Sequence, residues 1–253
     1  MDNIIGIMGA MPEEIDGVVK LLENRREYST GRRIYYSGSI NGIHTVVVFS
    51  RWGKVAAATT AATLVNRFSI SKLLFTGVAG AIHPTLRTGD VVVSKRLIQH
   101  DLDARPLIKQ FEIPLLDKTF LEADPGLVLM AEKAVNLLLQ NKTLHKVIGE
   151  KVLKEFNLSH PKLYTGDVAS GDQFFYASAQ KKILQTALTD ILCVEMEGAA
   201  VAQVCYENEI PFVVIRTISD DADEHAPVNF PAFVKTIASA YSSEIIKNIY
   251  SQM

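Results

Sequence analysis

Short apolar segments alternate along this chain with longer segments whose apolar positions recur every three or four residues. The short segments are typical of strands buried on both faces, and the longer ones of helices that pack one side against a sheet. We predict strands over residues 4–8, 34–39, 43–49, 73–76, 90–94, 163–169, 191–194 and 211–218. We predict helices over residues 53–66, 125–140, 177–187, 198–208 and 231–250, and a further helix that opens at residues 11–14.

Strands and helices alternate to the end of the chain, and no linker, repeat or low-complexity segment interrupts them. This order predicts one α/β domain over residues 1–253, a sandwich with helices on both faces of the sheet. Asn41 and Gly42 predict a type I′ hairpin turn between two strands. The small residues 77–81 predict a turn, and the irregular stretch at 97–119 predicts a loop over one end of the sheet.

Composition restricts the class of protein. Hydrophobic residues make up 48% of the chain and charged residues 21%, the formal net charge is -2, and no long basic block occurs. These values are typical of a globular protein and argue against binding of nucleic acid or of a membrane surface. No stretch reaches the ~18–20 apolar residues of a membrane span, and the N-terminus is acidic where a signal peptide is basic. We expect a cytoplasmic protein.

The two cysteines lie in segments predicted to be buried. Cys193 is part of an apolar, strand-like run and Cys205 of a helical pattern, and the C-x-x-C spacing of metal ligands does not occur. We therefore expect two reduced thiols in a reducing compartment.

Candidate chemistry is concentrated where predicted strands end. In open α/β sheets, ligands bind beyond the carboxyl ends of the strands. The segments in question are residues 8–14, 50–54, 77–81, 170–175, 195–197 and 219–223. They are rich in acids, glycine and aromatic residues and carry almost no positive charge.

Two of these segments place acids directly after an apolar strand. Glu195 and Glu197 flank Met196, so a carboxylate could accept hydrogen bonds from ribose hydroxyls while the thioether packs on the sugar. Asp220, in a closed pocket, could keep its proton and donate it to a leaving group. The alternative for both segments is that the acids only cap helices.

Two further segments fit the recognition of a purine nucleoside. Phe174 and Phe175 follow a glycine turn and could stack on a base, or they could be ordinary core residues. Small residues at 9–10 would let the backbone approach a ligand closely, and Glu14 in the first helical turn could activate a water. The alternative for Glu14 is that it only complements the helix dipole.

Taken together and in this order, these motifs resemble those of the 5′-methylthioadenosine/S-adenosylhomocysteine nucleosidases, within the nucleoside phosphorylase superfamily. The resemblance covers essentially the whole chain. The motifs that carry it are IMGAMPEE at 7–14, GKVA at 53–56, TGVAG at 76–80, ASGDQF at 169–174, VEMEGA at 194–199 and ISDDAD at 218–223.

The resemblance implies a fold, a reaction and a role for each matching residue. The fold is a three-layer α/β/α sandwich with a mixed central sheet, and the reaction is hydrolysis of an adenine nucleoside. Asp220 would protonate N7 of adenine, Glu14 would activate water for attack at C1′, and Glu197 would hold the ribose hydroxyls. The implied substrate-binding residues are Met11, Trp52, Ala79, Gly80, Phe174, Phe175, Glu195, Met196, Glu197, Arg216 and Phe230.

The resemblance also implies a homodimer that needs no metal and no organic cofactor. Leu107 and Pro114 of one protomer would reach the 5′ pocket of the other. Five features depart from the family pattern. Val78 replaces a serine that supports the catalytic aspartate in some relatives, Ala81 replaces a frequent glycine, Pro12 replaces a frequent acid, Trp52 replaces a smaller aliphatic residue, and the region 141–164 is longer than expected.

Two alternatives stay open at this point. A phosphorylase of the same superfamily needs arginines to bind phosphate, but Phe75 and Thr76 occupy the stretch where one is expected. A non-catalytic nucleoside-binding protein would lack the catalytic acids, which this chain has. The range of 5′ groups also stays open: methylthio, homocysteinyl, deoxy and futalosine-type nucleosides all fit the motifs.

Overall fold

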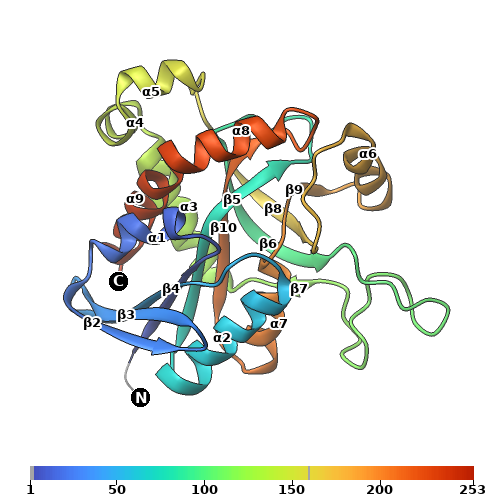
Figure 1. The fold of residues 1–253 in the computed structure, drawn as a ribbon, viewed down its shortest axis with the longest axis horizontal. Coiled ribbons are helices and arrows are strands. Elements are labelled where there is room, and N and C mark those ends of the chain that lie inside the picture. Colours follow the sequence, from blue (N-terminus) through green and yellow to red (C-terminus); the bar gives the residue numbers. More distant parts are fainter. Residues whose placement is uncertain (1–2, 159) are drawn as a thin grey trace.

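The computed structural model describes residues 3–158 and 160–253 (Figure 1). Its strands are β1 (Ile5–Gly9), β2 (Glu23–Thr30), β3 (Arg33–Ile40), β4 (Ile43–Phe49), β5 (Lys72–Ala81), β6 (Val91–Gln99), β7 (Leu121–Glu122), β8 (Leu163–Ser170), β9 (Ile191–Glu195) and β10 (Phe212–Asp220). Its helices are α1 (Pro12–Val19), α2 (Lys54–Phe68), α3 (Pro125–Leu139), α4 (Asn141–Ile148), α5 (Glu150–Glu155), α6 (Ser178–Ala187), α7 (Gly198–Glu207), α8 (Ala226–Phe233) and α9 (Ser239–Tyr250), with a π-helical turn, η1 (Val234–Ala238), before α9.

Each predicted strand and helix overlaps an observed one, and the predicted hairpin turn is confirmed. Asn41 and Gly42 have φ of 49° and 79°, the positive values that a type I′ turn requires at both central residues. The predicted helix at 231–250 begins earlier, at Ala226, and contains Pro231. It continues through η1 into α9 and ends at Tyr250 as predicted, but the π-helical turn within it was not predicted.

Several expectations from the sequence were wrong. Residues 77–81 are not a turn but the second half of β5, and β6 runs on to Gln99, inside the stretch predicted to be loop. Strand β2 was not predicted because its sequence is polar and its side chains are exposed, as suits an edge strand. The unassigned region 141–164 forms two short helices, α4 and α5, and then the start of β8.

The sheet is mixed, with the order β10-β6-β8-β9-β5-β1-β4-β3-β2. Strands β4, β1, β5 and β10 are successive parallel neighbours, whereas β6 pairs antiparallel to β10. Because β5 pairs with both β10 and β9, the strands β5, β10, β6, β8 and β9 close into a ring. Strands β1, β4, β3 and β2 extend from this ring as an open sheet, and the short β7 pairs with β6.

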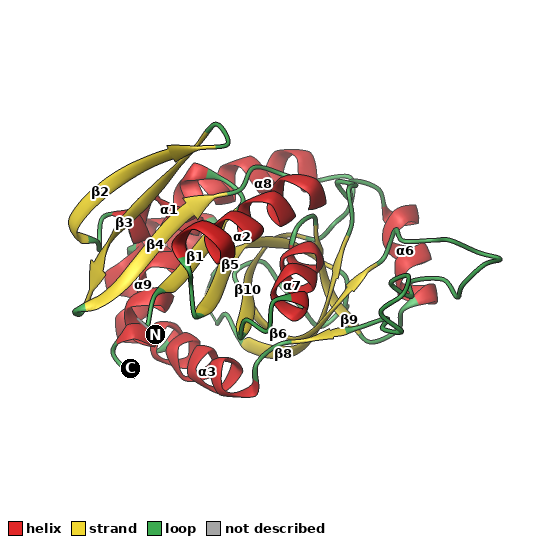
Figure 2. Ribbon diagram, turned by 90° about the horizontal axis from the view of Figure 1, so that it is seen from below, coloured by secondary structure: helices red, strands yellow, loops and turns green. Residues whose placement is uncertain are grey.

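Helices cover both faces of the sheet, which confirms the three-layer α/β/α arrangement. One buried cluster joins α1, α3 and α9 to the sheet, and a second joins α2 and α7 to its other face (Figure 2). Successive side chains of β10 belong to different clusters: Val213 and Ile215 to the first, Val214 to the second. The alternation explains why this strand reads as an unbroken apolar run, since both of its faces are buried.

The carboxyl ends of β5, β8, β9 and β10 meet at one place. Asp220 at the end of β10 is paired with Gly80 near the end of β5, and Gly80 is also paired with Val194 near the end of β9. Ser170, the last residue of β8, is paired with Glu195, the last of β9. The sheet closure therefore gathers the strand-end segments around a common point. Within the described parts of the chain, no helix is both long and apolar enough to cross a membrane.

Candidate active site

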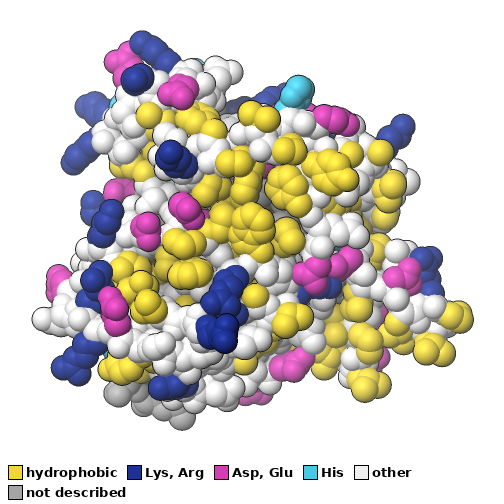
Figure 3. Space-filling model, viewed as in Figure 1, with side chains coloured by type: hydrophobic (Ala, Val, Ile, Leu, Met, Phe, Trp, Pro, Cys, Tyr) yellow, Lys and Arg dark blue, Asp and Glu magenta, His cyan; other side chains and the backbone are white. Residues whose placement is uncertain are grey.

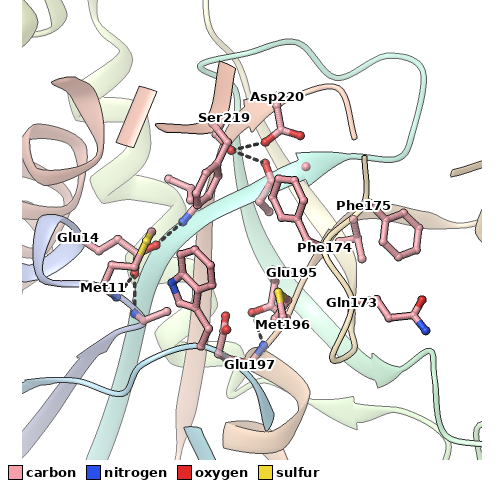
Figure 4. Close-up of a pocket in the computed structure, with 17 residues that line it drawn as sticks. Met11, Glu14, Gln173, Phe174, Phe175, Glu195, Met196, Glu197, Ser219 and Asp220 are labelled. Carbon is pink, nitrogen blue, oxygen red and sulfur yellow. Dashed lines mark hydrogen bonds between the residues drawn. The ribbon is translucent and has the colours of Figure 1, made fainter. Parts of the chain in front are cut away.

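A cavity with about 550 Å³ of empty space, partly open to solvent, lies where these strand ends meet (Figure 4). The residues that line the cavity are Ala10, Met11, Glu14, Trp52, Val78, Ala79, Gly80, Gln173, Phe174, Phe175, Val194, Glu195, Met196, Glu197, Ser219, Asp220 and Phe230. Glu14, Glu197 and Asp220 approach it from three sides (Figure 4).

Glu14 is buried at the start of α1, and backbone amides hold both of its carboxylate oxygens. Oε2 accepts from the N–H groups of Ala10 at 2.5 Å and Met11 at 3.0 Å, and Oε1 accepts from that of Val78 at 3.0 Å. Burial is the largest influence on the pKa of Glu14 and raises it, while the charge of Arg216 and these amides act to lower it. The position of Glu14 requires glycine at residue 77, where a Cβ would lie 2.7 Å from Oε1.

Arg216 and Glu195 form a buried ion pair, in which Glu195 lines the cavity and Arg216 lies outside the lining. The guanidinium Nη2 donates to Glu195 Oε2 at 2.7 Å, and the same group lies 4.0 Å from the ring centre of Phe75. Glu195 also accepts from the Ser170 hydroxyl and from the backbone amides of Glu197 and Gly198. Because both of its oxygens accept hydrogen bonds, Glu195 holds the turn that carries Glu197. The positive charge of Arg216 partly offsets the negative charge of the buried acids.

Glu197 is buried at the entry to α7 and accepts one hydrogen bond, at Oε1, from the backbone N–H of Gly53 at 2.8 Å. Gly53 has φ of 92°, which favours glycine at this position. The remaining acceptor capacity of Glu197 faces the cavity, where it suits a pair of hydroxyl donors. Burial, followed by the charge of Glu195, raises the pKa of Glu197 to about 8.

Asp220 ends β10 and is bonded on both oxygens. Oδ1 accepts from the N–H of Ala222 at 2.9 Å, and Oδ2 lies 2.7 Å from the hydroxyl oxygen of Ser219 (Figure 4). Burial is the largest influence on the pKa of Asp220 and raises it, the bonds from Ser219 and Ala222 lower it, and the charges of Asp221 and Asp223 raise it. A buried carboxyl with a raised pKa can serve as a proton donor.

Aromatic side chains form one wall of the cavity and its rim. Phe230 meets Phe174 edge to face with ring centres 5.5 Å apart, and Trp52 meets Phe230 in the same way at 6.1 Å. Trp52 is 57% exposed, so it stands at the rim rather than inside. Phe175 is buried against His100, with ring centres 5.3 Å apart. Such an aromatic wall suits contact with a flat apolar ligand group.

The structure brings most of the predicted site residues together. The exceptions are Arg216, which lies outside the lining, and Leu107 and Pro114, which do not line the cavity of this chain. Sequence reasoning missed Ala10, Val78, Gln173, Val194 and Ser219 as lining residues. All five are sequence neighbours of predicted site residues. The sequence did not show that their side chains would point into the cavity.

The raised pKa of Glu197 predicts how stability changes with pH. Unfolded glutamate ionises near its ordinary pKa of 4.5, whereas the buried side chain keeps its proton up to about pH 8. Between these values the folded state binds more protons, so stability falls as pH rises. We expect the melting temperature of the ligand-free protein to fall from pH 5 to pH 8, and Glu197→Gln to make this decline shallower. The exposed Glu155→Gln should leave it unchanged; an equal slope in wild type and Glu197→Gln would contradict the assignment.

Comparisons with known proteins agree with this geometry. The family model of the phosphorylase superfamily matches residues 4–251. A 5′-methylthioadenosine/S-adenosylhomocysteine nucleosidase from Anoxybacillus flavithermus is 31% identical over 250 residues, 98% of this chain and 98% of the relative. The Neisseria meningitidis nucleosidase in complex with methylthio-immucillin-A has a TM-score of 0.86 and 29% identity, covering 99% of this chain and 100% of that one. The native futalosine hydrolase of Helicobacter pylori has a TM-score of 0.84 and 30% identity, covering 99% and 98%.

The match to the superfamily spans nearly all of the described chain, and the identity to the nucleosidases extends over the same length. The resemblance stated from the motifs is thereby confirmed, and so is the fold. The chain belongs to the phosphorylase superfamily and, within it, to the 5′-methylthioadenosine/S-adenosylhomocysteine nucleosidases, which are N-glycosyl hydrolases.

Proposed function

We propose that this protein hydrolyses the N-glycosidic bond of 5′-methylthioadenosine and S-adenosylhomocysteine, releasing adenine and the 5′-thio-substituted ribose. The relative from Anoxybacillus flavithermus is named for these two nucleosides, and the Neisseria meningitidis structure holds a methylthio-immucillin. The cavity offers an aromatic wall for a base, acids for a sugar, and the thioethers of Met11 and Met196. These features suit an adenine nucleoside with an apolar 5′ substituent.

In the mechanism, Asp220 donates its proton to N7 of adenine as the bond between C1′ and N9 breaks, so that the base leaves neutral. Glu14 accepts a proton from the water that attacks C1′ from the other face. Glu197 accepts hydrogen bonds from the ribose hydroxyls. The sugar passes through an oxocarbenium-like state, and the oxygen atoms of the surrounding acidic side chains stabilise its positive charge.

The charge of the cavity supports water rather than phosphate as the nucleophile, and this observation carries the proposal. Among the described residues that line it, four are acids and none is lysine or arginine. The buried Arg216 is engaged by Glu195. A phosphate would meet the carboxylate of Glu14 without the cations that phosphate sites use.

The proposal includes a cytoplasmic homodimer in which Leu107 and Pro114 of one protomer reach the cavity of the other. Hydrophobic side chains gather across the middle of the face shown in Figure 3. Leu107 is 90% exposed on an irregular segment, available for such a contact. Cys193 and Cys205 are free, buried thiols, which suits a reducing compartment. Gel filtration of the active enzyme tests the dimer, and an active monomer would contradict it.

The function is tested by measuring adenine release from methylthioadenosine in phosphate-free buffer and again with added phosphate. We expect adenine and free methylthioribose at the same rate under both conditions. Release only with phosphate, with formation of a sugar 1-phosphate, would identify a phosphorylase and remove the role given to Glu14. S-adenosylhomocysteine and futalosine, assayed in parallel, define the range of 5′ groups. No release from any of them would favour a non-catalytic binding protein.

A further inference from the structure

A β-bulge places Ser219 beside Asp220. In β10, Ile218 is paired with Ala79 of β5 and Asp220 with Gly80, so Ser219 is an extra residue without a partner on β5. In a regular strand, neighbouring side chains point to opposite faces. The bulge breaks this alternation, and both Ser219 and Asp220 line the cavity (Figure 4).

The hydroxyl of Ser219 has two acceptors within reach and one hydrogen to donate. Its oxygen lies 2.7 Å from Asp220 Oδ2 and 3.3 Å from the carbonyl oxygen of Ala79. Both side chains are buried, with exposed fractions of 1% for Ser219 and 3% for Asp220. Among the described residues, Ser219 provides the side-chain hydrogen bond to Asp220. The partner of Asp220 on β5, Gly80, and the preceding Val78 and Ala79 carry no hydroxyl.

We propose that Ser219 is a positioning residue whose hydroxyl changes its acceptor as Asp220 loses its proton. While Asp220 is protonated, the hydroxyl donates to the Ala79 carbonyl and leaves the acid free to face N7. When the O–H bond of Asp220 breaks and the proton passes to N7, the electron pair stays on the carboxylate. The Ser219 hydroxyl then turns to donate to Oδ2, while its own proton stays on its oxygen.

This change of acceptor favours the transition state over the ground state. The bond from Ser219 to a carboxylate is charge-assisted and stronger than its bond to a neutral carbonyl. It therefore strengthens as negative charge develops on Asp220, and only such differential interactions raise kcat. The rotation needs no movement of the backbone, because both acceptors already lie around the same oxygen.

The proposal rests on the proposed function and is tested by a double-mutant cycle. Ser219→Ala should lower kcat by about 10- to 100-fold with little change in KM, since a bond to a charged group is lost. It should also move the alkaline limb of the pH profile to higher pH, because an unsupported Asp220 is a weaker acid. Ser219→Thr, which keeps the hydroxyl, should restore most of the activity. Combined with Asp220→Asn, Ser219→Ala should have no further effect.

Ser242→Ala is the matched control, because it removes a buried hydroxyl that is bonded to Thr76 at 2.9 Å. It should leave kcat and the pH profile unchanged. The proposal is overturned if Ser219→Ala keeps the wild-type rate and profile, or if its effect adds to that of Asp220→Asn. Thermal unfolding distinguishes a loss of positioning from a folding defect. A folding defect would lower the fraction of active enzyme without moving the pH profile. Absence of activity in the wild type would overturn the proposed function itself, so the two failures are distinct.

Discussion

Replacing Asp220 by asparagine is expected to lower kcat for adenine release by about 10²–10⁴-fold, the range for loss of a general acid. An amide cannot donate the proton that lets adenine leave as a neutral base. Activity depends on the protonated form of Asp220, so it should fall as pH rises through the pKa that burial raises. The residual activity of the variant should lack this alkaline limb. Initial rates from pH 5 to pH 9 provide the measurement.

The hydrogen bonds around Asp220 allow this substitution without a clash. An asparagine oxygen can accept from the N–H of Ala222, and its amide can donate to Ser219, which can then donate to the Ala79 carbonyl. We therefore expect normal folding and retained binding of methylthioadenosine. The exposed neighbour offers the control for kcat, since Asp221→Asn removes a carboxylate outside the cavity lining, and the loss of its charge should only move the alkaline limb toward lower pH. A wild-type kcat in Asp220→Asn would mean that another group protonates the base.

The sequence predicted those parts of the fold in which local pattern and burial agree. Strand β10 is buried along its whole length, and its apolar run marks it. Strand β2 forms through pairing with β3, and its exposed polar side chains give no apolar signal. The second half of β5 is rich in small residues because other groups approach it closely, as Glu14 and Arg216 approach Gly77. Its composition therefore resembled that of a turn.

The candidate site could be predicted in part from the rule that ligands bind beyond the carboxyl ends of strands. Glu14, Glu197 and Asp220 each follow or end a strand, and the closure of the sheet brings these ends together. The rule does not say which way a side chain points. Arg216 was expected among the substrate-binding residues but does not line the cavity and is paired with Glu195, and Ser219 enters the cavity through a bulge. Both outcomes depend on the register of strands distant in sequence, which local pattern does not contain.

Replacing Glu14 by glutamine is expected to lower kcat by about 10²–10⁴-fold through loss of the general base. Three backbone amides converge on its carboxylate, two on Oε2 and one on Oε1. A glutamine oxygen can accept from Ala10 and Met11, but its NH₂ group then faces the N–H of Val78. This unfavourable contact between two donors should lower the melting temperature as well, so thermal unfolding is measured together with kcat.

The adjacent Glu13 separates the catalytic role of Glu14 from a general effect of charge. Glu13 is exposed in the first turn of the same helix, outside the cavity lining, and Glu13→Gln removes the same charge from the same helix end. That variant should keep the wild-type kcat, losing only a small helix-dipole contribution to stability. Glu14→Gln should still bind adenine, because the aromatic wall and Asp220 are unchanged. If it binds adenine and turns over normally, water is activated elsewhere. If it loses binding and turnover together, Glu14 serves to shape the cavity rather than to accept a proton.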